Sequence, residues 1–295
     1  MELVSYRSRG EVRLGVMDGE RVIDLQRAGE AAGRPLPSDM RAFIGLGEAG
    51  LDAAEAAVKS GAGAVSGEVR LAAPLQNLTK NLFCVGRNYK EHIIEGARAR
   101  GREPRFPEFV EFFSKPPTTV IGHEDDIRLD PKVTKQLDYE VEFTVVIGHD
   151  GRDIPAARAN DYIYGYTVGN DVTARDAQAA HGQWFKGKSM DTFGPLGPCL
   201  VPKRYYPNPQ QARLTLRVNG ETRQDSNTSD MLFDIPTIIE QLSLGITLQA
   251  GDIIMTGTPS GVALGMSPQA WLQDGDVLEA EVEGIGVLRN RVVQV

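Results

Sequence analysis

Residues 138–146, DYEVEFTVV, alternate apolar and polar side chains with the period of a β-strand. One face of this strand would carry the apolar residues Val141, Phe143 and Val145. The opposite face would carry Glu140 and Glu142, two carboxylates that repel each other and whose burial costs several kcal/mol per ion on an order-of-magnitude scale. The spacing alone leaves two interpretations open, a solvated face of an edge strand and a divalent-metal site.

Similar short patterns recur along most of the chain. Further strands are expected at 81–85, 162–168, 214–218, 252–256 and 277–282. Asn219-Gly220 has the sequence of a hairpin turn, and the best helix, 235–244, begins after Asp234 and ends before Gly245. Many strands separated by turn signals predict a mixed, mostly β protein with a closed or sandwich-like architecture rather than alternating βαβ units.

The first 75 residues follow a different pattern. Strands at 13–16 and 21–25 flank the turn dipeptide Asp18-Gly19, and a helix at 51–59 ends before Gly61, so this part is expected to be a small α+β unit. It carries no reactive chemistry, whereas Gly, Pro, Asp and His become denser after it. We therefore expect a small N-terminal domain at 1–75 and a larger catalytic domain at 76–295.

Composition narrows the functional classes. The chain has 295 residues, 41% of them hydrophobic, and a net charge of −8, which argues against binding to a phosphate backbone. The sequence shows neither a signal peptide nor an apolar run of membrane-spanning length. Cys84 and Cys199, the two cysteines, are expected to be buried structural thiols. These features predict a cytoplasmic protein with neither nucleic acid nor membrane as a partner.

A second group of carboxylates follows the strand expected at 162–168. Thr173 and Asp176 have the spacing of a capping box, which predicts a helix running to about residue 180. Asp171 would then lie outside the helix. Together with Glu140 and Glu142 it would make a three-carboxylate oxygen site suited to Mg²⁺ or Mn²⁺.

Three further polar residues surround this segment. Arg175 and Gln178 are three residues apart and would share a helix face, directed either at a ligand near Asp171 or at solvent. Lys188 lies among aromatic and small residues, where it is either beside an anionic substrate or simply exposed.

His92 and Glu95 are one helical turn apart, so the carboxylate could orient the imidazole as a general base, although such pairs also occur on surfaces without a role. The Gly-, Arg- and Pro-rich segment 96–109 that follows is typical of a mobile segment over a site. The turn 257–261, GTPSG, offers backbone N–H groups to a carboxylate but lacks the lysine of a phosphate-binding loop.

As an ordered set, several motifs over residues 80–295 resemble the fumarylacetoacetate hydrolase family: VGRNYKEHIIE, FFSKPPTTVIG, LDYEVEFTVVIG, GYTVGNDVTARDAQ, FKGKSMDTFGPLGP, RVNGETRQ and GDIIMTGTPSGV. The resemblance implies a β-roll catalytic domain and a homodimer. It implies that the metal ligands are Glu140, Glu142 and Asp171, and that His92 and Glu95 activate water from a lid. It also implies that substrate or its developing oxyanion is contacted by Lys188, Arg175, Gln178 and Thr258.

The resemblance predicts a metal-dependent enzyme for a small 2-oxo acid, most directly a hydrolase that cleaves a C–C bond in a 2,4-dioxo acid such as an acylpyruvate. The N-terminal unit and the segment 261–276 look most like members related to oxaloacetate decarboxylases or tautomerases, which makes those reactions in the same site the alternative. A non-catalytic binding protein is disfavoured, because every expected reactive residue type is present.

Overall fold

The structure is a computed structural model that describes residues 1–67 and 69–295. The first ten strands in chain order are β1 (Leu3–Ser8), β2 (Glu11–Asp18), β3 (Arg21–Asp24), β4 (Arg70–Ala72), β5 (Leu82–Gly86), β6 (Glu111–Lys115), β7 (Val120–Ile121), β8 (Asp126–Leu129), β9 (Leu137–Asp138) and β10 (Val141–Ile147). They are followed by β11 (Ile163–Asn170), β12 (Thr173–Ala174), β13 (Gly194–Pro202), β14 (Arg213–Val218), β15 (Glu221–Asn227), β16 (Ile253–Met255), β17 (Val277–Val282) and β18 (Gly286–Gln294).

Helices are short and lie between these strands. The α-helices are α1 (Leu25–Ala31), α2 (Met40–Ile44), α3 (Gly47–Lys59), α4 (Lys90–Ala99), α5 (Ala159–Tyr162), α6 (Arg175–Ala180), α7 (Phe185–Lys188) and α8 (Ile235–Ser243). Single 3₁₀ turns are η1 (Pro117–Thr119), η2 (Ala156–Arg158), η3 (Lys203–Tyr205), η4 (Pro209–Gln211), η5 (Thr228–Asp230) and η6 (Ala263–Gly265).

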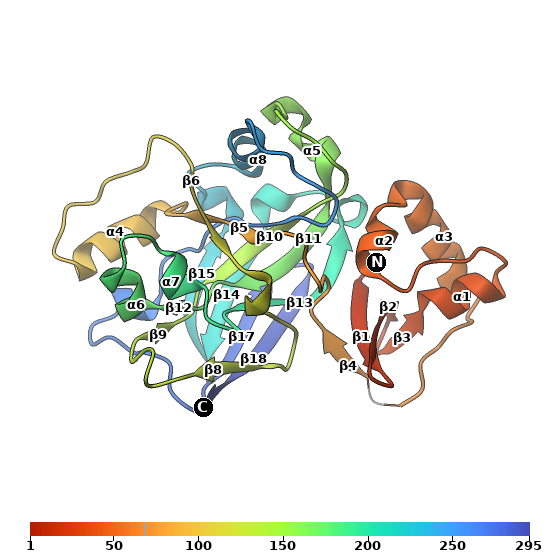
Figure 1. Cartoon of the computed structure of the whole chain (residues 1–295), viewed down its shortest axis with the longest axis horizontal. Coiled ribbons are helices and arrows are strands. Elements are labelled where there is room, and N and C mark those ends of the chain that lie inside the picture. The colour runs from red at the N-terminus through yellow and green to blue at the C-terminus, as the bar shows by residue number, and fades with distance from the viewer. Residues whose placement is uncertain (68) are drawn as a thin grey trace.

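Two sheets make the architecture. The larger has the strand order β3-β2-β1-β13-β11-β10-β16-β5-β6, with β4 beside β1 and β7 beside β13. The smaller has the order β15-β14-β17-β18-β8, and β9 pairs separately with β12. The N-terminal strands thus continue the large sheet through a pairing of Leu3 with Leu200, while α1, α2 and α3 lie at one end of the molecule and α4, α6 and α7 at the other (Figure 1). The division into domains at residue 75 stays a prediction.

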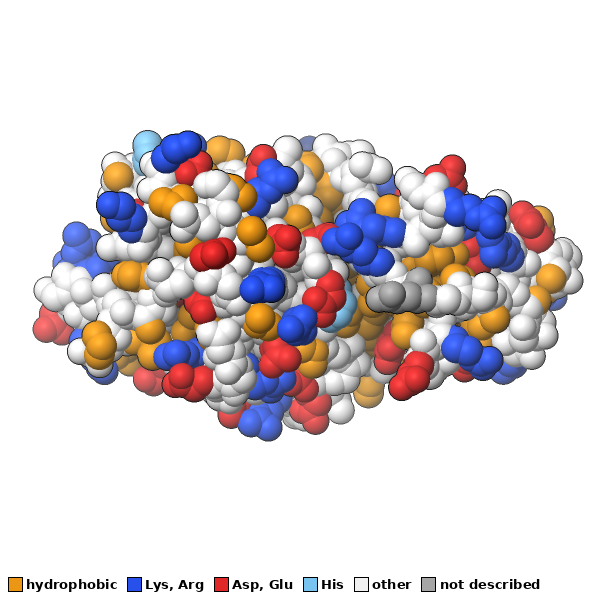
Figure 2. All heavy atoms as spheres, turned by 90° about the horizontal axis from the view of Figure 1, so that it is seen from below, with side chains coloured by type: hydrophobic (Ala, Val, Ile, Leu, Met, Phe, Trp, Pro, Cys, Tyr) orange, Lys and Arg blue, Asp and Glu red, His pale blue; other side chains and the backbone are white. Residues whose placement is uncertain are grey.

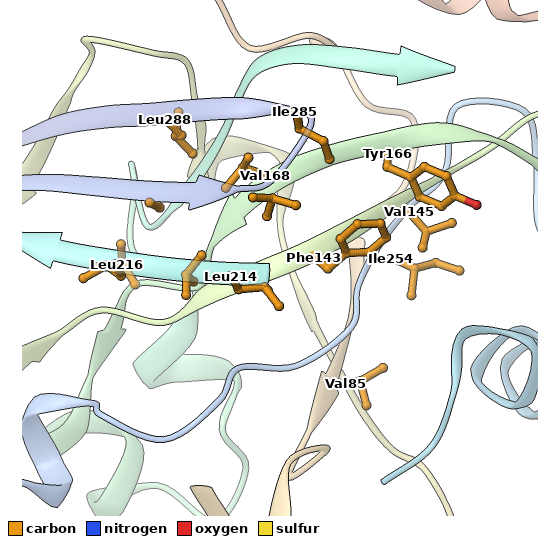
Figure 3. Packing of buried hydrophobic residues seen from close by; sticks show 14 of the residues in the cluster. Val85, Phe143, Val145, Tyr166, Val168, Leu214, Leu216, Ile254, Ile285 and Leu288 are labelled. Atoms are coloured by element: carbon orange, nitrogen blue, oxygen red, sulfur yellow. The ribbon is translucent and has the colours of Figure 1, made fainter. Parts of the chain in front are cut away.

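The main core lies between the two sheets (Figure 3). Phe143 and Val145 of β10 and Val168 of β11 meet Leu214 of β14 and Leu288 of β18 in one buried cluster. The expected inward face of β10 is therefore confirmed. Burying apolar side chains of this size is worth about 1.5–3 kcal/mol each, so this layer fixes the strand that carries the two glutamates.

The other face of β10 is divided between packing and chemistry. Val146, near one end, joins a second cluster with Met255 and the N-terminal residues Leu3, Leu14 and Phe43. Glu142, four residues earlier on the same face, points away from the main core. The N-terminal unit thus covers the apolar end of this face, and the polar end is left to the candidate site.

Several local predictions are confirmed. The mixed, mostly β fold is observed, both expected hairpins form, and Asp234 caps α8 by accepting a hydrogen bond from the Thr237 amide at 2.9 Å. The predicted capping box is wrong. The Thr173 hydroxyl donates to the Asp171 carbonyl, and Asp176 instead accepts from the Thr134 hydroxyl at 2.6 Å, because residue 173 is held in β12. The helix nevertheless runs to Ala180.

The surface fits the composition. On the face shown in Figure 2, acidic and basic side chains are interspersed rather than gathered into a basic stripe. Across residues 1–67 and 69–295, none of the helices has both the length and the apolar character that crossing a bilayer requires.

Candidate active site

Three carboxylates meet where β10 begins and β11 ends. Antiparallel pairing sets Val141 opposite Asn170, which brings Glu140 and Glu142 to Asp171. One oxygen from each of the three lies within 4.8 Å of the others, and the three residues are only 4%, 1% and 0% exposed. Because β10 lies between β11 and β16 in the sheet, the solvated edge-strand interpretation is wrong.

Two buried lysines hold two of these carboxylates. Lys188 donates to Glu140 Oε2 at 2.7 Å and to Asp171 Oδ2 at 2.6 Å. Lys115, at the end of β6, donates to Asp171 Oδ1 at 2.5 Å and to the Val172 carbonyl at 3.1 Å. The Glu140 and Asp171 charges raise the pKa of Lys188 despite its burial, whereas burial lowers the pKa of Lys115.

Arg175 ties the cluster to a fourth carboxylate. Its Nε donates to Asp138 Oδ2 at 2.8 Å, one terminal nitrogen donates to Glu140 Oε1 at 2.5 Å, and the other donates to Gln178 Oε1 at 3.2 Å. Asp138 also accepts from the backbone amide of Ala263 at 2.8 Å. Each of the three guanidinium nitrogens of Arg175 therefore donates a hydrogen bond to a protein side chain. Burial acts to raise the pKa of Glu140, but Lys188 and Arg175 outweigh it and lower that pKa.

Glu142 is treated differently from its neighbours. Its Oε2 accepts from the Gly257 amide at 2.7 Å, and within the described chain no lysine or arginine nitrogen lies within ion-pair distance of it. Burial and the charges of Asp171 and Glu140 hold the pKa of Glu142 well above its usual range.

The charges of the cluster do not balance. Four carboxylates, those of residues 138, 140, 142 and 171, face three cations, Lys115, Arg175 and Lys188, which leaves one negative charge when all are ionised. A carboxylate trio offering oxygen ligands only, with one member lacking a cationic partner, fits a hard divalent cation such as Mg²⁺ or Mn²⁺.

His92 faces the same site from α4, and Glu95 on the same helix holds its imidazole. His92 Nδ1 lies 2.8 Å from Glu95 Oε1, and Glu95 Oε2 accepts from the Gly261 amide at 2.9 Å. Since the carboxylate accepts from Nδ1–H, Nε2 is the nitrogen left as a base. The turn 257–261 thus holds two carboxylates, as its amides suggested, but both belong to the protein.

One cavity of about 1070 Å³ joins these parts. It is lined by His92, Glu140, Glu142, Gln178 and Lys188, together with arginines and aromatic residues.

Arg175 and Thr258 also line this cavity, but Thr258 is committed to the protein. Its hydroxyl donates to the Val141 carbonyl at 2.9 Å and accepts from Gln224 at 2.8 Å.

Two members of the cluster escaped the sequence analysis. Lys115 lies in the motif FFSKPPTTVIG, and Asp138 is the first residue of the strand pattern at 138–146. The available signal for Lys115 was the short segment 111–115, EFFSK, in which two phenylalanines precede the lysine directly before Pro116-Pro117. Cys84 and Cys199 are buried free thiols, as predicted.

Comparison with known proteins supports a family assignment. The family model described as "Fumarylacetoacetate (FAA) hydrolase C-terminal" matches residues 81–293. The chain is 48% identical over 225 residues to oxaloacetate tautomerase YisK of Bacillus subtilis, covering 76% of this chain and 73% of the relative. It is 37% identical over 300 residues to the mitochondrial oxaloacetate tautomerase fahd2 of Xenopus laevis, covering 99% and 90%.

Solved structures agree over the whole chain. A fumarylacetoacetate hydrolase from Exiguobacterium antarcticum superposes with a TM-score of 0.84 at 37% identity, covering all of both chains. Maleylpyruvate hydrolase from Sphingobium sp. SYK-6, in complex with manganese(II) and pyruvate, has a TM-score of 0.78 at 28% identity, covering 100% of this chain and 99% of that one. The fold and the family resemblance are confirmed, and this chain belongs to the fumarylacetoacetate hydrolase family.

Proposed function

We propose that this protein is a divalent-metal-dependent enzyme that interconverts the keto and enol forms of a short 2-oxo dicarboxylic acid such as oxaloacetate. The main observation that supports this proposal is that the Glu140–Glu142–Asp171 trio lies beside one cavity that His92 and Lys188 line. The names of the two relatives support this alternative over the C–C bond hydrolase that the sequence suggested first.

The three carboxylates would hold Mg²⁺ or Mn²⁺, and the Sphingobium structure with manganese supports a metal of this kind. When bound, the cation would supply Lewis-acid stabilisation of negative charge on the 2-oxo oxygen.

The chain's own residues would move the protons. His92, with Glu95 fixing its Nδ1–H, would take the proton from C3 of the keto acid through Nε2. Within the described residues, Lys188 uses two of its three N–H groups on Glu140 and Asp171, which leaves one to donate to the 2-oxo oxygen. Lys188 would give the 2-oxo oxygen the proton of the enol hydroxyl, and solvent would then take the proton from His92 and return one to Lys188, so the forward reaction balances and its reversal restores the keto form.

Arg175 and Gln178 would act on this substrate in different ways. Arg175 is held by three side chains and would position Glu140 and Gln178. Gln178 accepts from Arg175 through Oε1, so its amide N–H groups are the ones directed to a substrate carboxylate. The homodimer expected from the resemblance remains a prediction.

The proposal is tested by an assay that measures the loss of the enol absorbance of oxaloacetate in the presence of Mg²⁺ or Mn²⁺. The products are identified in parallel. We expect His92→Ala to slow interconversion by at least about 10²-fold, as removal of a general base does, while Mn²⁺ still raises the melting temperature. His149→Ala, on an exposed imidazole that packs at a tilt against Tyr162, is the matched control and should keep full activity.

C–C bond hydrolysis is the second candidate, because the His92–Glu95 pair that would move a proton is equally suited to activating water. Release of pyruvate from acetylpyruvate, without faster enol loss from oxaloacetate, would replace the proposed reaction by this one. Release of CO₂ from oxaloacetate at the rate of enol loss would point to decarboxylation instead.

A further inference from the structure

Five arginines line the cavity of the candidate site, in a protein whose net charge is −8. Two of them have carboxylate partners. Arg175 pairs with Asp138 and Glu140 inside the cluster, and Arg87 pairs with Glu111 at the start of β6.

The other three are different. Arg100, Arg102 and Arg105 follow one another from the end of α4, and among residues 1–67 and 69–295 no aspartate or glutamate forms an ion pair with any of them. Three guanidinium groups around one opening attract an anion, since each presents a fork of N–H donors suited to a carboxylate.

Arg100 is the best placed of the three. Its Nη1 donates to the Gly96 carbonyl at 3.0 Å, so the side chain folds back along the last turn of α4 beside Gly96 and Ala97, which also line the cavity. A Cβ at Gly96 would lie 3.2 Å from that Nη1. The glycine therefore leaves room for the guanidinium to lie against the helix.

Charged groups at the inner end of the cavity also act on Arg100. Burial lowers its pKa, repulsion from Arg175 and Arg102 lowers it further, and Glu140 acts in the opposite direction. Arg100 is exposed to solvent and lines the same cavity as Arg175, so an anion bound between the two guanidinium groups would relieve their repulsion.

We propose that Arg100, supported by Arg102 and Arg105, binds the second carboxylate of the substrate and so selects 2-oxo dicarboxylic acids over 2-oxo monocarboxylic acids. The inference rests on the proposed function, because it assigns the inner end of the same substrate to the Glu140–Glu142–Asp171 cluster. Phe113 and Trp184, in edge-to-face contact at 5.6 Å between ring centroids, line the cavity and would flank the carbon chain.

A binding experiment with two ligands that differ only at one end tests this assignment. The Mn²⁺-loaded protein is titrated with 2-oxoglutarate and with 2-oxovalerate, which have the same chain length and differ by a carboxylate in place of a methyl group. We expect the wild-type protein to bind 2-oxoglutarate at least about tenfold more tightly, which is the size of one charge-assisted hydrogen-bond pair.

Arg100→Ala should reduce that ratio to about twofold or less by weakening 2-oxoglutarate alone, and Gly96→Ala should reduce it in part by displacing the guanidinium. Arg98→Ala is the matched control, because Arg98 lies in the last turn of α4, two residues before Arg100, and is exposed like Arg100 but does not line the cavity. It should keep the wild-type ratio.

Equal affinities in the wild-type protein, equal weakening of both ligands by Arg100→Ala, or an equal effect of Arg98→Ala would each overturn the inference. The oxaloacetate assay separates it from the proposed function. A preserved 2-oxoglutarate preference without keto–enol activity would refute the function and leave the carboxylate assignment standing. Activity with a ratio that Arg100→Ala does not change would refute the assignment alone.

Discussion

Asp24 in the N-terminal unit and Glu142 beside the cavity are equally hidden from water, at 0% and 1% exposure, yet they are surrounded very differently. Asp24 accepts from Arg13 Nε at 2.6 Å, from the Tyr6 hydroxyl at 2.5 Å and from the Arg27 amide at 2.8 Å. The chain thus satisfies this carboxylate completely, with one cation and two neutral donors.

Glu142 receives far less. It accepts from the Gly257 amide, and its nearest charged neighbours of the cluster include two other carboxylates, Glu140 and Asp171. The pKa of Glu142 is accordingly raised by burial and by those charges. Burial would also raise the pKa of Asp24, but Arg13 and the Arg27 amide outweigh it and lower that pKa. Asp24, paired within the fold, is therefore a structural carboxylate, whereas Glu142, which has no cationic partner and lies beside two further carboxylates, is a candidate ligand.

Glu142→Gln should give the largest effect. We expect keto–enol activity to fall about 10³-fold, roughly 4 kcal/mol in transition-state stabilisation, because one of three anionic ligands is lost. The free energy of unfolding of the metal-free protein should change by less than about 1 kcal/mol, since an amide replaces a carboxyl group that the fold does not pair. Enzyme kinetics and urea denaturation in EDTA measure the two quantities.

The control for this variant is Glu279→Gln, the same change on β17 of the smaller sheet, where Glu279 pairs with Arg217 at 3.3 Å. It should keep full activity and full stabilisation by Mn²⁺. If Glu142→Gln instead unfolded the metal-free protein, Glu142 would belong with Asp24 as a structural carboxylate, and the contrast between the two regions would be lost.

Asp24→Asn should show the opposite pattern, with a smaller magnitude. We expect a loss of about 2–4 kcal/mol in the free energy of unfolding, because Arg13 loses its carboxylate while the asparagine can still cap α1. Stabilisation by Mn²⁺ should be unchanged, since Asp24 lies in the N-terminal unit. Urea denaturation with and without Mn²⁺ measures both.

Asp39→Asn provides the matched control. Asp39 caps α2 through the Ala42 amide at 2.9 Å and is exposed, so the change should cost less than about 0.5 kcal/mol. Equal losses in the two variants would mean that the cap, rather than the buried charge pair, stabilises this region.

Only part of the environment of Glu142 could be predicted from the sequence. Strand alternation predicted which face of β10 is core and set Glu140 and Glu142 apart from it, because the period of two is a local property of the backbone. The meeting of these residues with Asp171 depends on the register of β10 with β11, which the spacing allowed but did not determine.

The sequence did not predict which cationic side chains from other elements would contact the carboxylates. Lys115 reaches Asp171 from β6 at the far edge of the large sheet, 56 residues away in the chain, and no local pattern links the two. The capping box failed for a related reason. Thr173 has the correct spacing to Asp176, but its pairing with Asp138 in β12 and β9 holds it as a strand residue, so tertiary structure overrides the local signal.

The smallest effect concerns the pH dependence of stability, in protein kept free of metal by EDTA. Because the pKa of Asp24 is lowered in the folded state, its contribution is fully present above the unfolded value of about 3.9 and is lost as the pH falls through the folded value. We therefore expect the stability difference between the wild-type protein and Asp24→Asn to be constant from about pH 5 to 7 and to shrink below about pH 4. A difference that stayed constant in acid would show that Asp24 stabilises the N-terminal unit by its shape and hydrogen bonds rather than by its charge.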